Sequence, residues 1–172
     1  MSIVNKFASL TFEGQYYRFD HLAPFVFTLN GQAREGGDIR VRVSFQSHVF
    51  SPRSEANEQC HLVDQSGAPR VFCVNRYAKS LTLPDFCRRM LAENMLTWES
   101  YDKNRISNMA AMEGPLTSGE HHVAVYYLFP SQASGVEVEM VIKSAYRKVL
   151  NFDNIKRGST SFSSQKNATM TR

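Results

Sequence analysis

The sequence predicts a single α+β domain dominated by an antiparallel sheet, with one main helix and a C-terminal hairpin. Three observations support this fold class. First, 42% of the 172 residues are hydrophobic and 21% are charged, so the chain can bury a core without disulfides or a metal. Second, twelve Phe and seven Tyr lie mostly in short runs separated by Gly and Pro, which favours strands over a helical bundle. Third, the best helix signal covers one short segment, residues 82–95.

The strands of the first half are predicted from runs of β-branched and aromatic residues. Residues 12–30 read as two short strands with a break at 20–24. The clearest strand is "IRVRVSFQSHVF", residues 39–50, in which apolar and polar residues alternate. Its polar face would carry Arg40, Arg42, Ser44, Gln46 and His48. A loop at 51–69 follows, and "RVFCVNRYA", residues 70–78, is predicted to resume a strand.

The main helix is predicted from its capping residues and its apolar spacing. Thr82 occupies the N-cap position, Asp85 follows three residues later, and a proline lies in the first turn. The apolar side of this helix would carry Phe86, Met90, Leu91 and Met95. The next segment, residues 97–120, is ambiguous between a strand and a helical turn.

The C-terminal hairpin is predicted from two alternating runs, at 122–129 and 136–149, which flank the loop "PSQASG". In the second run the alternation assigns one face to Val136, Val138, Met140, Ile142, Ser144 and Tyr146. Ser144 and Tyr146 would then form the polar end of the core face. Three cations follow in the same strand: Lys143, Arg147 and Lys148.

Residues 156–172 are predicted to form a flexible basic tail after a globular domain at 1–155. The tail is rich in Ser, Thr, Asn and basic residues and cannot bury enough apolar area to offset its ordering entropy. From Lys143 onward, seven basic residues are accompanied by one acidic residue, Asp153. Such an end could bind a polyanion such as RNA, or it could simply keep the protein soluble.

Several classes of protein are disfavoured by the sequence. We expect a cytoplasmic protein with no membrane segment, because no signal peptide and no run of about 18 apolar residues is present. The three cysteines are widely spaced, which argues against a disulfide framework or a zinc site. No P-loop, Gly-x-Gly-x-x-Gly, His-Glu-x-x-His or Gly-x-Ser-x-Gly motif occurs. We therefore expect neither a cofactor nor a metal.

His48 is the first candidate catalytic residue. Its imidazole titrates near working pH, and Arg40 and Arg42 on the same predicted strand face could hold a phosphate. Arg76 and Tyr77, just before the main helix, are candidates for binding a phosphate and stacking a base. A solvated sheet face and ordinary surface arginines would give the same pattern.

Ser144 and Tyr146 are the other two candidate catalytic residues. Lys143, Arg147 and Lys148 lie beside them in the sequence and could bind the phosphates of a nucleic acid. A purely structural interpretation is equally available, because a tyrosine near the edge of a sheet usually packs its ring and hydrogen-bonds its hydroxyl.

The segments "RVRVSFQSHVF", "RVFCVNRYAKSLTLPDF" and "VEVEMVIKSAYRK" together resemble a family of small bacterial and prophage-associated proteins often labelled heat-shock protein C. That resemblance covers roughly residues 12–150 and implies no specific activity. The order of a helix followed by a hairpin that ends in Ser-Ala-Tyr is also similar to the barnase, EndoU, colicin and RelE-type ribonucleases. This second similarity implies an antiparallel sheet that presents His, Arg, Lys, Ser or Tyr to a scissile phosphate.

The leading hypothesis is therefore a nucleic-acid-binding protein and, more specifically, a metal-independent ribonuclease of a mobile element or stress system. In the alternative hypothesis the protein is a non-enzymatic interaction module, such as an inhibitor, immunity or stress protein, that binds a host or cognate protein. A third hypothesis is a β-rich domain that binds a small molecule.

Overall fold

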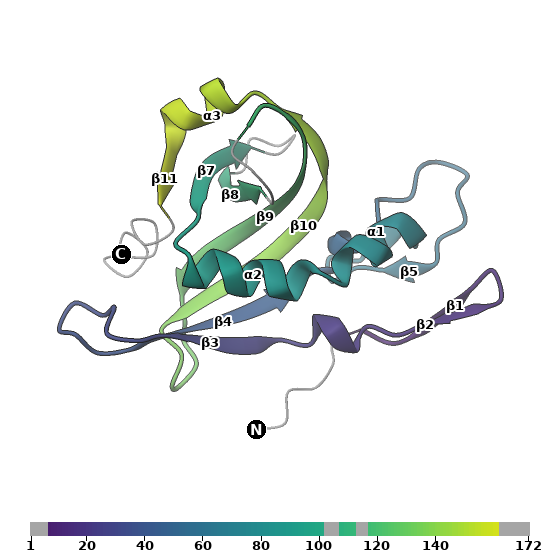
Figure 1. Ribbon diagram of the computed structural model, residues 1–172. Helices are drawn as coiled ribbons and strands as arrows, with labels where there is room; N and C mark the ends of the chain where they lie inside the picture. The colour runs from purple at the N-terminus through teal and green to yellow at the C-terminus, as the bar shows by residue number, and fades with distance from the viewer. Residues whose placement is uncertain (1–6, 102–106, 113–116, 162–172) are drawn as a thin grey trace.

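The computed structural model describes residues 7–101, 107–112 and 117–161, and within them the fold is α+β, as predicted. A seven-stranded sheet with the strand order β11-β7-β8-β9-β10-β4-β3 dominates these residues (Figure 1). Neighbouring strands in it are antiparallel except for β4 and β10, which are parallel. Its strands are β3 (Phe25–Leu29), β4 (Ile39–Phe45), β7 (Leu96–Tyr101), β8 (Ser107–Met112), β9 (Gly119–Pro130), β10 (Val138–Leu150) and β11 (Ser159–Ser161).

Smaller elements surround this sheet. Two short antiparallel pairs lie outside it, and each is closed by a tight connection. The first pair is β1 (Leu10–Phe12) with β2 (Gln15–Tyr17), and the second is β5 (Leu62–Val63) with β6 (Pro69–Arg70). The helices are α1 (Val74–Ser80), α2 (Leu83–Ala92) and α3 (Phe152–Gly158), and the 3₁₀ turns are η1 (Asp20–Leu22) and η2 (Ser47–Val49).

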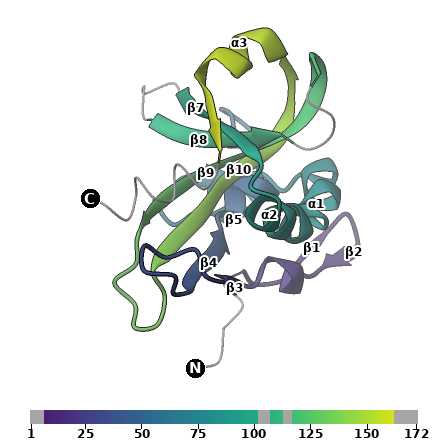
Figure 2. The ribbon, with the colours of Figure 1, turned by 60° about the vertical axis from the view of Figure 1, so that its left-hand side comes forward.

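The main core lies between α2 and one face of the sheet. Helix α2 crosses the sheet over β10 and β4 (Figures 1 and 2). Its apolar side is fully buried, as the spacing predicts, and Phe86 and Met90 are inaccessible to solvent. The sheet contributes alternate residues of its two parallel strands, which are Ile39, Val41, Val43 and Phe45 from β4, and Val138, Met140 and Ile142 from β10. The predicted alternation is therefore confirmed as far as Phe45, and the predicted helix is confirmed over Leu83–Ala92, with Met95 beyond its end and partly buried against the core.

The predicted face of the last strand is wrong beyond Ile142, because a β-bulge at Lys143 shifts the register. Ile142 pairs with Tyr126 of β9, whereas Ser144 pairs with Val125. Paired residues of antiparallel strands share a face, so the bulge moves Ser144 to the face opposite Ile142. Tyr146 follows it and packs in a second, smaller cluster with Val123, Val125, Leu150, Trp98 and Ile155.

Helical structure replaces the C-terminal part of two predicted strands. The strand that was expected at 39–50 ends at Phe45, and His48 lies in the turn η2. The strand expected at 70–78 is β6 followed by α1, whose first hydrogen bond runs from the backbone N–H of Tyr77 to the carbonyl of Cys73 at 2.9 Å. The Tyr77 ring then packs against aromatic rings of the core, including that of Phe72 at a centroid distance of 5.7 Å. This tertiary packing outweighs the modest β-propensity of Val, Phe and Tyr in the segment.

The hairpin of β9 and β10 is confirmed, and its far end is covered by α3 (Figure 1). Residues 156–161, the beginning of the predicted tail, lie in α3 and in β11, which pairs with β7 and forms one edge of the sheet. The remainder of the predicted tail, 162–172, lies outside the described residues. Among the residues that are described, none of the helices is long and apolar enough to span a membrane.

Candidate functional site

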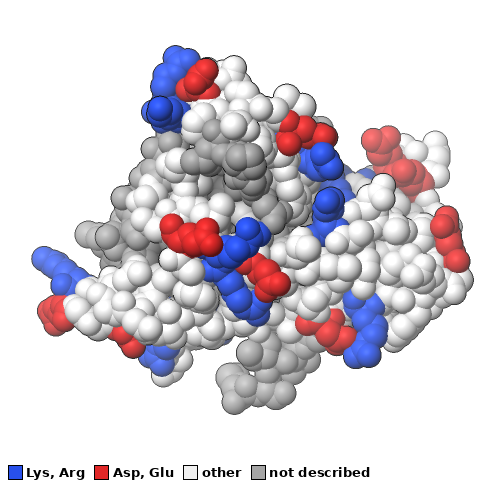
Figure 3. All heavy atoms as spheres, viewed as in Figure 1, with Lys and Arg blue, Asp and Glu red and all other residues white. Residues whose placement is uncertain are grey.

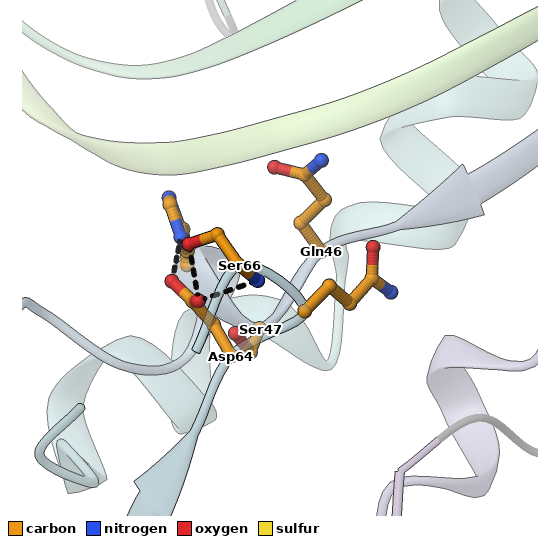
Figure 4. Close-up of a pocket in the computed structure, with 6 residues that line it drawn as sticks. Gln46, Ser47, Asp64 and Ser66 are labelled. Carbon is orange, nitrogen blue, oxygen red and sulfur yellow. Dashed lines mark hydrogen bonds and ion pairs between the residues drawn. The ribbon is translucent and has the colours of Figure 1, made fainter. Parts of the chain in front are cut away.

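The candidate site is built around His48 and Asp64, which come from separate segments of the chain. His48 lies in η2 directly after β4, and Asp64 follows the short strand β5. The backbone N–H of Gln46 donates to the carbonyl of Ile142 at 2.9 Å and so fixes η2 beside β10. His48 Nε2 and Asp64 Oδ2 are 3.0 Å apart. Both residues line a cavity of about 120 Å³ together with Gln46, Ser47, Gln65 and Ser66 (Figure 4).

Asp64 is held in place by the turn that it begins. Its Oδ1 accepts hydrogen bonds from the backbone N–H of Ser66 at 2.9 Å and from the Ser66 hydroxyl at 2.7 Å (Figure 4). It also accepts from the backbone N–H of Ala68 at 3.0 Å. Gly67, at φ +81°, supplies the left-handed conformation in this turn. Burial of the carboxyl disfavours its ionised form, but the hydrogen bonds from Ser66, His48 and Ala68 outweigh burial and hold the pKa of Asp64 well below its usual range. Asp64 is therefore an ionised hydrogen-bond acceptor.

The carboxylate of Asp64 determines which nitrogen of His48 carries the proton. An ionised carboxylate can only accept, so His48 Nε2–H is the donor. Burial lowers the pKa of His48, and the positive charges of Arg70 and Lys143 lower it further, while Asp64 partly opposes this shift. The imidazole is consequently neutral at pH 7, and its Nδ1 bears a lone pair. This nitrogen has no hydrogen-bond partner among the residues that the structure describes, so it can accept a proton.

The titration of His48 provides a direct check of this arrangement. We expect NMR to give a pKa below 6.5, the ordinary value for histidine, and to show the Nε2–H tautomer. Replacing Asp64 with Asn should lower this pKa further, because the hydrogen bond and the charge of Asp64 both favour the imidazolium. A ¹⁵N-resolved pH titration of both proteins measures the two values. A pKa above 6.5 in the wild type would contradict the assignment.

Cationic side chains surround the His48–Asp64 pair. Arg70 is buried, with its Nη1 4.0 Å from Asp64 Oδ2, and its guanidinium donates to the backbone carbonyl and, at 3.4 Å, to the hydroxyl of Ser51. Arg76 of α1 donates from Nη1 to the carbonyl of His48 at 3.2 Å. Lys143 lies in the β10 bulge with its ammonium 5.4 Å from the centre of the Tyr127 ring, and its charge contributes to lowering the pKa of His48. The site therefore combines a neutral imidazole with an excess of positive charge, which suits an anionic ligand.

Three of the predicted site residues are thus brought together: His48, Arg76 and Lys143. Three others are neutralised by glutamates at different places on the sheet. Arg40 pairs with Glu137 at 3.4 Å, Arg42 with Glu139 at 2.6 Å, and Arg147 with Glu120 at 2.6 Å. Lys148 is exposed near the far end of β10. On the face shown in Figure 3, basic and acidic groups lie next to one another and do not form a continuous basic surface.

The predicted aromatic and hydroxyl residues lie apart from the pair. Tyr77 is committed to the core, since its hydroxyl donates to the carbonyl of Arg18 at 2.8 Å and its ring contacts Tyr17, Phe19 and Phe72. Tyr146 belongs to the second cluster. Ser144 follows the bulge on the same face as Tyr146. The core packing of the Tyr77 ring does not favour its predicted base-stacking role. Tyr146 packs in the second cluster, whereas His48 lines the cavity, so the structure does not bring these two candidates together.

Sequence reasoning missed Asp64 and Arg70, which complete the site. The stretch "DQSGA", which begins at Asp64, is typical of a turn in which an aspartate side chain accepts hydrogen bonds from the backbone of the following residues. This turn pattern was the signal in the sequence that could have pointed to Asp64. No local pattern in the sequence indicates that Asp64 contacts His48. Among the described residues there is no group of three or more His, Cys, Asp or Glu that could hold a metal ion.

Residues 9–170 match a family model whose description is "YjaZ family". The match covers nearly the whole chain, including all the residues of the candidate site. Comparison with curated proteins and with solved structures gave no significant match.

Proposed function

The chain belongs to the YjaZ family, and we propose that it binds RNA and cleaves it without a metal, with His48 as the general base. One observation carries the proposal: a neutral, half-buried imidazole donates from Nε2 to an ionised carboxylate and lies among cationic side chains. The order of elements expected from the sequence, a helix followed by a hairpin, is similar to that of barnase-type ribonucleases and motivates the choice of RNA as an analogy only. We propose that the protein acts in the cytoplasm, where cellular RNA would be its substrate.

In this proposal the 2′-hydroxyl of a ribose is the nucleophile. His48 Nδ1 takes the proton of that hydroxyl as the oxygen attacks the neighbouring phosphorus. The bond from phosphorus to the 5′-oxygen breaks, and the 5′-oxygen takes a proton from water. The products are a 2′,3′-cyclic phosphate and a 5′-hydroxyl end, and His48 then releases its proton to solvent. Neither oxidant nor metal is needed for this transesterification.

The other residues of the site have separate roles in the proposal. Asp64 keeps the reactive nitrogen of His48 unprotonated and fixes the ring, in the way that a buried carboxylate orients a catalytic histidine. Arg76 and Lys143 would offset the charge that develops on the phosphorane. The amides of Gln46 and Gln65, which line the cavity, can donate to sugar or phosphate oxygens.

The test is incubation of end-labelled RNA with purified protein in the presence of a chelator. We expect discrete cleavage products, and we expect the Tyr146→Phe variant to give the same products at an unchanged rate, because Tyr146 lies in the second cluster. A strand of the same sequence with deoxyribose throughout should remain intact, since it lacks the nucleophile. Failure of the protein to bind or cleave RNA at moderate salt would overturn the proposal and favour the interaction-module alternative.

A further inference from the structure

Two arginines face each other directly beside the candidate site. Arg53 and Arg70 form an isolated antiparallel bridge, so their side chains project from the same side of the paired backbone. Arg70 is buried and held by Ser51, whereas Arg53 is exposed. Like charges placed directly opposite each other in a β-ladder are destabilising. An anion bound nearby would therefore reduce the repulsion between the two arginines.

A third arginine approaches the same place from α1. Arg76 is half-buried. Burial lowers the pKa of Arg70, and the charges of Arg76 and Arg53 lower it further, while Asp64 opposes this shift. Asp64 is the only carboxylate within ion-pair distance of these three arginines among the described residues, and it is already shared with His48. Arg53 and Arg76 have no acidic partner within the described part of the chain.

We propose that Arg53, opposite the buried Arg70, is the centre of a second phosphate subsite next to the His48 cavity, and that Arg76, which also contacts the His48 carbonyl, serves both this phosphate and the scissile one. The cluster (Arg53, Arg70 and Arg76) is joined to the cavity through two contacts, those of Arg70 with Asp64 and of Arg76 with the His48 carbonyl. Planar guanidinium groups bind phosphate oxygens in pairs and remain charged at every physiological pH. This inference deepens the proposed function and rests on it for the identity of the ligand: the subsite holds the RNA phosphate adjacent to the scissile one.

The phosphate-binding part of the inference is tested without RNA. Titration of the protein with inorganic phosphate at constant ionic strength, followed by calorimetry, should show binding that Arg53→Gln and Arg76→Gln each weaken about tenfold or more. The control is Arg18→Gln, which removes an exposed arginine paired with Asp20 elsewhere. It should leave the affinity unchanged. Equal phosphate affinity in wild type and Arg53→Gln would overturn the subsite.

Stability measurements separate a ligand-binding role of Arg53 from a structural one. In low salt and without phosphate, Arg53→Gln should unfold at the same temperature as the wild type or at a higher one, because the change relieves repulsion from Arg70 and Arg76. Added phosphate should then raise the unfolding temperature of the wild type more than that of the variant at the same phosphate concentration. A lower unfolding temperature for Arg53→Gln without phosphate would show that Arg53 stabilises the fold, and would contradict the inference.

The RNA part is tested with substrates of different length. A dinucleoside monophosphate has one phosphate and cannot occupy both the scissile position and the subsite, whereas a trinucleoside diphosphate can. We expect wild-type kcat/KM to be at least about tenfold higher for the longer substrate, and Arg53→Gln to reduce this ratio towards one. If phosphate binds as predicted but no RNA is cleaved, the proposed function fails and the subsite stands. If RNA is cleaved with no difference between the two substrates, the subsite fails and the proposed function stands.

Discussion

Substitution of His48 by alanine is expected to reduce the rate of RNA cleavage about 10²- to 10⁴-fold, which is the usual contribution of a general base. The imidazole is the one group at the cavity that both accepts a proton near pH 7 and is fixed by a carboxylate, at 3.0 Å. Single-turnover kinetics with saturating protein measure the chemical step directly. RNA affinity should fall much less than the rate, because the cations of the site remain.

His21 provides a matched control for this substitution. It is also a half-buried histidine whose pKa is lowered by burial, and its Nε2 lies 2.8 Å from the Ser80 hydroxyl. It lies outside the cavity of His48, so His21→Ala should leave the rate of cleavage unchanged once the fraction of folded protein is matched. An equal loss of rate in both variants would indicate damage to the fold and would remove His48 from its proposed role.

Substitution of Glu139 by alanine should lower the free energy of unfolding by about 2 kcal/mol. Glu139 is buried in β10 and accepts from Arg42 Nε at 2.9 Å, from Arg42 Nη2 at 2.6 Å and from the Ser131 hydroxyl at 2.6 Å. Arg42 and Glu139 are opposite each other in the parallel pair of β4 and β10, so this ion pair helps to fix the register that places η2. Urea unfolding followed by the fluorescence of Trp98, the only tryptophan, measures the change.

The matched control is Glu120→Ala, which removes a comparable contact from the surface. Glu120 pairs with Arg147 at the same 2.6 Å distance, but both side chains are about half exposed, at 52% and 56%. Exposed ion pairs contribute little, so we expect a loss below about 1 kcal/mol. Similar losses in the two variants would show that the burial of Glu139 has no particular importance for stability.

Much of the fold follows from periodic patterns in the sequence. The alternation of β4, the long hairpin and the apolar side of α2 each predicted the observed element, because burial of one face imposes a period of two or of 3.6 residues. The bulge at Lys143 has no such signal, and one extra residue was enough to move Ser144 and Tyr146 to the other face. Helix α1 was missed because the aromatic packing of Tyr77 is a long-range contact.

The candidate site was predictable only in part. His48 was singled out for its residue type, although the strand expected to carry it ends three residues earlier, at Phe45. Arg76 and Lys143 were singled out for their charge, and the fold brings both close to His48. The contacts with Asp64 and Arg70 join residues in different segments whose pairing leaves no local pattern. Arg40, Arg42 and Arg147 have the same charge in the sequence as Arg76, and only the fold shows that glutamates neutralise them.

The most direct test of the central claim is the identity of the ends that cleavage produces. A defined RNA is incubated with the wild type and with His48→Ala in the presence of a chelator, and the masses of the products are measured by mass spectrometry. Attack by the 2′-hydroxyl predicts 2′,3′-cyclic phosphate and 5′-hydroxyl ends from the wild type and intact RNA from the variant. Intact RNA in both reactions, or fragments that end in a 5′-phosphate, would contradict the role of His48 as a general base.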